Sequence, residues 1–397
     1  MLFILPQVSR RRAGVIVICL GMILSVSCSK PPSKPTNSWN QNAAATYLDY
    51  RERWWQQWPD SARDHGTFCV SCHTALPYSI SRPALRQALN EPTPTADEQQ
   101  LIEDIVKRVR LWQSVGPYYS DEGYDPKGTE SRGTEAVLNA FILANYDARH
   151  GQLSNDTRTA FQNMWAVQQK TGETAGAWPW LQFDLEPWEA TDSQFYGAAL
   201  AAIAVGVAPE NYQSSADIQN NLTLLRGYLL REYTKQSLIH RVDLLWASTK
   251  LPGLLDADQQ RAIVNEVLRK QQADGGWRLS SISWKGRGVV PLVRSWIRED
   301  GTPIDGNSDG YATAFLTYVL QEAGVPRENQ QLQRGLAWLE QHQNQAEGSW
   351  SSASINKRRP QSSEIGRFMS DAATAYAVLA LSESQGRANP VASAASH

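Results

Sequence analysis

The sequence predicts an all-α protein in which a short cysteine-containing segment precedes a larger domain of repeated helices. Amphipathic helical periodicity alternates with nearly continuous apolar runs, which is typical of helices stacked in two layers. A helix followed by a glycine and a tryptophan recurs along the chain, which indicates a repeat architecture. The net charge of -2 provides no field that would attract nucleic acid.

The N-terminal residues resemble a lipoprotein signal peptide. Three consecutive arginines precede an apolar run from Ala13 to Leu24, and two small residues, Ser25 and Ser27, lead to Cys28. The run is shorter than the roughly 20 apolar residues of a membrane-spanning helix. The resemblance implies a signal peptide over residues 1–28 and a lipid anchor on Cys28, with an uncleaved anchor as the alternative. Both interpretations place the rest of the chain in the bacterial cell envelope, on the periplasmic side.

A haem-attachment motif follows a short tether. Residues 29–37 (SKPPSKPTN) are expected to be extended, because Pro-rich segments fold poorly. The segment 38–115 then contains Cys69-Val-Ser-Cys72-His73, the spacing typical of c-type haem attachment. In such a motif the two thiols bond to porphyrin vinyl groups and the histidine ligates iron. The sequence therefore predicts one covalent haem c, with His73 as the proximal iron ligand.

Three other roles for Cys69 and Cys72 fit the sequence less well. A disulfide between them would close so small a loop that it would restrict the unfolded chain little. A zinc site needs four ligands, and the chain after Cys28 has no second cysteine pair. A thioredoxin-like pair would need a strand–helix–strand context, which residues 47–112 do not show.

The sixth ligand of the haem iron is not evident from the sequence. Residues 38–115 contain no methionine, and the other histidine nearby is His65. The remaining candidates lie in the repeat domain: His150, His240, His342, Met164 and Met369. We therefore expect either a ligand supplied by that domain or an open iron position that binds a small molecule.

The repeat domain is predicted over residues 129–384, before a disordered tail at 385–397. Amphipathic helices ending in Gly-x-Trp are expected at 157–178, 258–277 and 331–350, and a helix of small apolar residues follows each. Because an evenly apolar helix must be covered on every side, the two kinds of helix should form two concentric layers. The glycine should adopt a positive φ, and the tryptophan should stack on the helix end.

These units resemble a known repeat. The helix-Gln-x-x-Gly-x-Trp pattern is similar to the QW repeat of squalene-hopene cyclases and of prenyltransferase β-subunits, with good copies at Gln169–Trp178, Gln272–Trp277 and Gln341–Trp350. The resemblance implies an α/α toroid. It also implies an apolar ligand or substrate, such as an isoprenoid or another hydrocarbon.

The catalytic acid motif of those cyclases, Asp-x-Asp-Asp, does not occur. The weak catalytic candidates are Asp305, Asp309 and Asp192. However, Asp192, Asp309 and Asp371 share one repeat position, each after Ser or Thr and each at the start of a helix. Helix N-caps or first-turn acids explain all three positions, at about 1 kcal/mol apiece, so we expect this structural role.

Two loops carry more charged and aromatic residues than plain connections need. One covers residues 183–192 with Trp188 and Glu189, and the other covers 280–300 with Trp284 and Trp296. Such loops could be solvated charge runs, or they could rim a cavity and dock the haem segment.

Three functions are compatible with the sequence. The first is an exported cytochrome c-like protein with electron transfer or small-molecule binding at the haem, whose toroid binds an apolar ligand or an envelope redox partner. The second is an envelope enzyme that transforms an isoprenoid, by cyclisation or by haem-dependent oxidation. The third is a non-catalytic scaffold.

Overall fold

The computed structural model describes residues 39–121, 123, 125–283 and 297–386. Cys28, the tether 29–37, residues 387–397 of the predicted tail 385–397 and much of the predicted loop 280–300 lie outside these residues, whereas 385 and 386 belong to the helix Phe368–Gly386. The described residues belong to one compact unit. None of the helices in the described part is long and apolar enough to cross a membrane.

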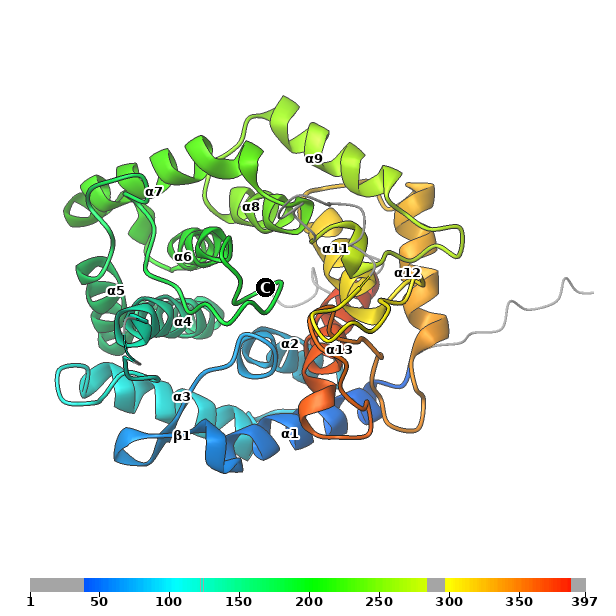
Figure 1. Ribbon diagram of the computed structural model, residues 1–397, viewed down its shortest axis with the longest axis horizontal. Helices are drawn as coiled ribbons and strands as arrows, with labels where there is room; N and C mark the ends of the chain where they lie inside the picture. The colour runs from blue at the N-terminus through cyan, green and yellow to red at the C-terminus, as the bar shows by residue number, and fades with distance from the viewer. Residues whose placement is uncertain (1–38, 122, 124, 284–296, 387–397) are drawn as a thin grey trace, which may run out of the picture. The chain divides into compact units, whose positions relative to one another are not determined.

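Twelve described α-helices form two concentric layers, an outer and an inner one (Figure 1). The outer layer consists of α1 (Gln41–Gln57), α3 (Ala96–Arg110), α5 (Asn155–Ala166), α7 (Gln219–Glu232), α9 (Ala257–Arg269) and α12 (Gln330–His342). The inner layer consists of α2 (Ala75–Ala88), α4 (Lys127–His150), α6 (Gln194–Val207), α8 (Leu238–Lys250), α11 (Gly310–Glu322) and α13 (Phe368–Gly386). Each inner helix packs on the next, and α13 packs back on α2. The predicted all-α toroid is confirmed.

The connections contain little other regular structure. A two-stranded antiparallel hairpin, β1 (Ala62–Arg63) and β2 (Thr67–Phe68), pairs Ala62 with Phe68 directly before the cysteine motif. Short 3-10 helices cover Pro59–Ser61, Asp64–Gly66, Tyr212–Ser214, Ala216–Ile218, Tyr233–Lys235, Leu279–Ser281 and Ile365–Arg367.

Burial explains which helices form each layer. In the inner helix α6 every residue from Phe195 to Val205 is buried, as expected for an evenly apolar helix covered on all sides. The outer helix α9 buries Ile263 and Val267 and exposes most of its remaining side chains. The amphipathic and apolar periodicities therefore correspond to the outer and inner layers, as predicted.

The cysteine-containing segment is part of the ring and does not form a separate domain. Its helices α1 and α2 fill the gap that the later helices leave between α13 and α4. The backbone N–H of Asn40 donates to Oε1 of Gln343 (2.6 Å), which joins the start of α1 to the end of α12. The predicted boundary between 38–115 and 129–384 does not appear, because the apolar inner helices need a neighbour on both sides.

The Gly-x-Trp turns have the predicted geometry. Three fully buried indole N–H groups each donate to a carbonyl oxygen near the end of the preceding outer helix: Trp178 to Met164 (2.6 Å), Trp277 to Val267 (2.8 Å) and Trp350 to Leu339 (2.7 Å). The glycines in the turns have φ of +104° at Gly176, +97° at Gly275 and +82° at Gly348. A side chain at these positions would be strained, which is why glycine is needed there.

A glutamine beside each turn connects successive repeats. Gln271 Nε2 donates to the carbonyl oxygens of Gly275 (2.8 Å) and Gln331 (2.7 Å). Gln168 and Gln343 make the equivalent pair of bonds, and the second acceptor of Gln343 is the carbonyl of Asn40. The bridging residues are thus Gln168, Gln271 and Gln343. The first two lie one position before the glutamine of the quoted repeat, and Gln343 lies two positions after it. The bond from Gln343 to Asn40 joins the last of these turns to the residue before α1.

Candidate functional site

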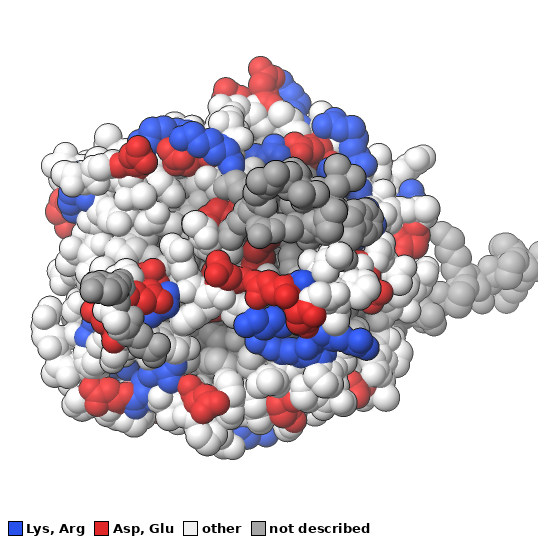
Figure 2. All heavy atoms as spheres, viewed as in Figure 1, with Lys and Arg blue, Asp and Glu red and all other residues white. Residues whose placement is uncertain are grey.

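The inner helices begin at the same end of the ring, because each follows an outer helix of opposite direction. The cysteine motif, the loop 183–192 and the first turns of α8, α11 and α13 meet at this end, which we call the mouth. Figure 2 shows charged side chains of both signs near the centre of the face turned to the viewer, where connecting loops lie in Figure 1.

The cysteine motif is held between the β1–β2 hairpin and α2. Trp55 Nε1 donates to the carbonyl oxygen of Cys69 at 2.7 Å. Ser71 Oγ accepts from the backbone N–H of Ala75 at 3.0 Å, which satisfies a donor at the start of α2. The backbone of the motif is therefore positioned by the surrounding chain.

Both thiols of the motif are free and buried. Cys69 is 5% exposed and Cys72 is 4% exposed, and no disulfide joins them. Burial raises the pKa of Cys69 to about 12 and raises the pKa of Cys72 well above its ordinary value. The two side chains are thus neutral thiols on the inner side of the ring.

Aromatic rings orient the imidazole of His73. Phe368 stacks on it with a centroid distance of 3.9 Å and an angle of 19° between the ring planes. Trp55 meets it edge-on at 4.9 Å, and Trp188 lies at 6.4 Å. Burial, aided by the positive charge of Arg51, lowers the pKa of His73 well below its ordinary value. The imidazole is therefore neutral.

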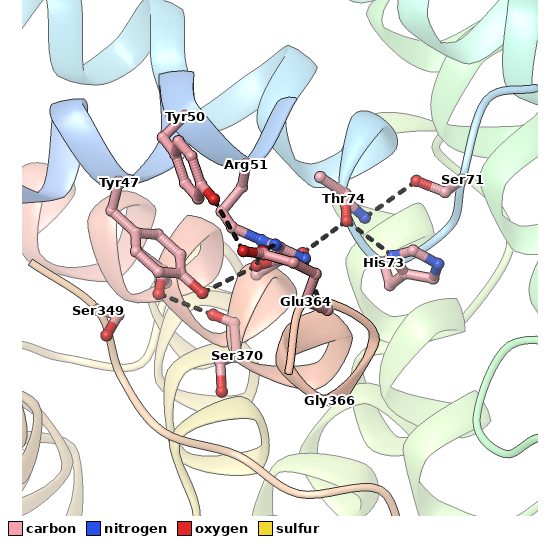
Figure 3. Close-up of polar contacts among 12 residues, drawn as sticks. Tyr47, Tyr50, Arg51, Ser71, His73, Thr74, Ser349, Glu364, Gly366 and Ser370 are labelled. Carbon is pink, nitrogen blue, oxygen red and sulfur yellow. Dashed lines mark hydrogen bonds and ion pairs between the residues drawn. The ribbon is translucent and has the colours of Figure 1, made fainter. Parts of the chain in front are cut away.

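A hydrogen-bond chain assigns the tautomer of His73 (Figure 3). His73 Nδ1 lies 2.7 Å from Thr74 Oγ1, and Thr74 Oγ1 donates to Asp371 Oδ2 at 2.7 Å. Because the single hydroxyl hydrogen of Thr74 is used by the carboxylate, the hydroxyl oxygen must accept from Nδ1–H. The lone pair of the neutral ring is then on Nε2.

The carboxylate at the end of this chain belongs to a buried ion pair. Asp371 accepts from Arg51 Nε (2.7 Å) and Nη2 (2.9 Å) and from the hydroxyl of Tyr47 (2.9 Å). The side chains of Arg51 and Asp371 are 1% and 2% exposed. Arg51 also contacts Glu364, which accepts from Tyr50 at 2.8 Å. These residues join α1 to α13 at the place where the ring closes, which we call the seam.

Two of the three aspartates at the shared repeat position have the predicted structural role. Asp309 is the N-cap of α11, because Oδ1 accepts from the backbone N–H of Ala312 at 3.0 Å. Asp371 lies in the first turn of α13 and in addition binds Arg51. The catalytic candidate Asp305 is an exposed loop residue.

Asp192 does not cap a helix, contrary to the prediction. Ser193 takes the N-cap position of α6, and Asp192 Oδ1 instead lies 3.8 Å from Nε2 of His240. On the other side of the ring, His240 Nδ1 lies 3.1 Å from Asp243 Oδ2. Burial lowers the pKa of His240, but the two carboxylates outweigh burial and raise it to about 9. The cluster is thus an imidazolium between two acids.

Tyrosines of the inner helices line the same region. Tyr196, Tyr311 and Tyr376 are buried, and burial raises the pKa of each, with a further contribution from Asp243. Cys72 contributes to the raised pKa of Tyr196 and Tyr376. The Tyr196 hydroxyl has no hydrogen-bond partner within the described ranges. The ring centroids of Tyr196 and His240 lie 6.4 Å apart, and those of Tyr311 and Tyr376 lie 6.0 Å apart, so the tyrosines and the His240 cluster belong to the buried interior of the ring.

The loop 183–192 packs over the first turn of α11 at the mouth. Trp188 Nε1 donates to the hydroxyl of Tyr311 at 3.2 Å, and Glu186 N donates to Asn356 Oδ1 at 3.1 Å. Burial raises the pKa of Glu189 to about 7, although Arg359 and Lys127 oppose the rise. The loop therefore packs against the cysteine motif, through Trp188 and His73, and against the connection that contains Asn356. The residues 284–296 of the second loop lie outside the described part.

The other candidates for a sixth iron ligand are spread over the ring. His65 pairs with Asp64 on the surface at 2.9 Å. His150 Nδ1 and His342 Nδ1 each lie 2.8 Å from a carbonyl oxygen in the last turn of their helices. Both methionine candidates are buried, Met164 in α5 and Met369 in the first turn of α13. In the described part no group of three or more His, Cys, Asp or Glu side chains is arranged to hold a metal ion.

Several residues at the mouth were not identified from the sequence. Arg51, Thr74 and Phe368 belong to no recognisable sequence motif. Their contacts join segments that are about 300 residues apart in the chain. The pairing of His240 with Asp243 could have been suspected from the sequence, because a His-x-x-Asp spacing places both side chains on one face of a helix.

These features define the class of the protein: an all-α toroid with a buried Cys-x-x-Cys-His motif at its mouth. No family model matches the chain, and no curated protein matches it. Among solved structures, one that matches is a glycosidase variant, at 12% sequence identity and a TM-score of 0.49, with 87% of this chain and 98% of that chain covered. The identification of the toroid rests on the packing of this chain's own helices.

Proposed function

We propose that the protein is an exported c-type haem protein of the bacterial cell envelope, anchored by a lipid on Cys28. Cys69 and Cys72 would hold one haem through thioether bonds, and His73 would ligate its iron. The haem would supply a redox-active iron for electron transfer or small-molecule binding.

The neutral charge and the tautomer of His73 are the observations on which this proposal rests. A histidine that ligates a metal must be neutral, and it uses one ring nitrogen while the other donates a hydrogen bond. His73 meets both conditions, because Thr74 engages Nδ1 and leaves the lone pair on Nε2.

The thiols of the motif are also in the state that haem attachment requires. Cys69 and Cys72 are unpaired thiols, as thioether formation requires. The buried Tyr196 hydroxyl lacks a partner within the described residues, although buried polar groups are normally hydrogen-bonded. A polar atom of a bound group would satisfy this hydroxyl.

The second candidate function, an envelope enzyme, is favoured by the Asp192–His240–Asp243 cluster. Buried acids around an imidazolium are costly and are often kept for chemistry. The charged cluster and the tyrosines make an isoprenoid or other hydrocarbon a poorer ligand for this part of the protein than a polar molecule. They also argue against a plain scaffold.

The test is to produce the whole chain in a bacterium with a working cytochrome c maturation system. We expect the mature protein to exceed the mass of its acylated polypeptide by one haem. We also expect a reduced spectrum with Soret and α bands. A protein that weighs only as much as polypeptide and acyl groups would refute the proposal.

Thr74→Val is expected to raise the reduction potential of the iron. The valine has nearly the same shape but breaks the link from His73 to Asp371, so the imidazole becomes a poorer donor to ferric iron. A hydrogen bond worth about 1 kcal/mol corresponds to roughly 40 mV for a one-electron couple. A spectroelectrochemical titration measures this, with Thr46→Val on the exposed part of α1 as the control. Equal potentials in the two variants would argue against iron ligation by His73.

A further inference from the structure

We infer that a pocket at the end of the ring opposite the mouth binds a small organic anion, whose carboxylate pairs with Arg149. The pocket is open to solvent and has a volume of about 780 Å³, which is within the usual range for small-molecule sites. It is lined by α2, the connection from α2 to α3, the first half of α3 and the last turn of α4. The cysteine motif lies at the mouth, so this inference does not depend on the proposed haem.

The position of Arg149 in the pocket follows from a proline in α2. Pro83 has no backbone N–H, so inside the helix it leaves the carbonyl oxygen of Ser79, four residues earlier, without its helical donor. Arg149 Nη2 donates to this oxygen and to the carbonyl oxygen of Ile80, both at 3.3 Å. The guanidinium at the end of α4 is therefore held against α2 at the wall of the pocket.

Arg149 forms no ion pair with a carboxylate in the part of the chain that the structure describes. Both of its hydrogen bonds use Nη2, so the N–H groups on Nε and Nη1 remain for a ligand. The side chain is accessible through the pocket, but the surrounding protein desolvates it and lowers its pKa to about 10. Glu98 opposes this fall and the charge of Arg86 adds to it. A guanidinium that has lost water without gaining a carboxylate is well suited to bind one in a two-pronged pair.

The three glutamates of the pocket do not take the place of such a ligand. Glu98 pairs with Arg86 at 3.3 Å, and Glu91 pairs with the buried Arg82 at 2.7 Å. Glu103 is exposed on α3, where water solvates its charge. Two of the acids are therefore neutralised by other arginines and the third is solvated.

Apolar groups in the pocket indicate what else the anion carries. Pro83, Ile102 and Tyr146 line the pocket, and each is half-buried. A ligand with an apolar body would remove their remaining surface from water, whereas an inorganic ion would not. The class of ligand is therefore a carboxylate joined to an apolar ring or short chain.

Titrations of the whole protein with benzoate and with benzamide test the inference. The two molecules share one ring, but only benzoate carries a charge for Arg149. Saturation-transfer NMR on the ligand resonances gives a dissociation constant for each. Hydrogen bonds to a charged group are worth roughly a 10- to 100-fold change in this constant, so we expect benzoate to bind at least about 10-fold more tightly than benzamide.

Arg149→Met should weaken benzoate binding by about 10-fold or more and leave the binding of benzamide unchanged. Arg231→Met is the matched control, because Arg231 Nη2 also donates to two carbonyl oxygens, of Glu173 at 2.8 Å and Ala175 at 3.4 Å, but lies outside this pocket. The control should bind benzoate as the wild-type protein does.

Arg149→Lys keeps the test decisive if the methionine variant does not fold, as judged by circular dichroism. Lysine retains the charge but not the two-pronged geometry, so its affinity for benzoate should lie below that of the wild-type protein. Equal affinities of the wild-type protein for benzoate and benzamide, binding of neither, or an unchanged benzoate affinity in the folded Arg149 variants would overturn the inference. Haem does not enter this readout, so failure of the proposed function leaves the test valid.

Discussion

Replacing Cys69 and Cys72 together by serine is expected to abolish covalent haem while the helical ring stays folded. A serine hydroxyl is a far weaker nucleophile than a thiol and does not form the thioether bond. The contacts that position the motif involve other groups: the carbonyl of residue 69, the hydroxyl of Ser71 and the ring of His73. Haem-stained denaturing gels and intact mass measure the loss, and circular dichroism measures the helical content.

The double alanine variant controls for the polarity of serine. A buried hydroxyl without a partner costs about 1–3 kcal/mol, and alanine removes this penalty at both positions. If both double variants lose haem and keep the helical signal, the motif is an attachment site within a ring that folds by itself. Loss of helicity in both would mean that the ring requires the bound group, and haem retained by either variant would refute thioether attachment.

Arg51→Met is expected to reduce the free energy of unfolding by about 3–5 kcal/mol, because it leaves Asp371 as a buried charge without its main partner. Arg51 donates twice to Asp371, and both side chains are almost fully buried. The pair also joins α1 to α13, where the ring closes. Urea denaturation followed by tryptophan fluorescence measures the change.

Arg110→Met is the matched control for this experiment. Arg110 also pairs with an aspartate, Asp156 at 2.7 Å, but its side chain is 67% exposed. An exposed ion pair contributes about 0–1 kcal/mol, because water solvates both charges when the pair is broken. Similar losses in the two variants would show that the seam pair has no special role in closing the ring.

The local features of the fold were predictable because they depend on neighbouring residues. Gly275 and Trp277 lie within a few residues of the helix end that they cap, so their spacing alone indicated the turn. Helical periodicity separated inner from outer helices for the same reason. The role of Asp192 was not predictable, because its distinguishing partner, His240, comes from a different inner helix.

Sequence alone determined the all-α toroid and the Cys69–His73 motif, since both are encoded in short spacings along the chain. Only the tertiary structure decided that α1 and α2 complete the ring and that Asp371, 297 residues from Thr74, sets the tautomer of His73. The physical reason is ring closure: a circular stack brings α1 and α2 into contact with α13. Residues far apart in sequence then share one buried site. Local sequence patterns do not predict the hydrogen bonds of this site.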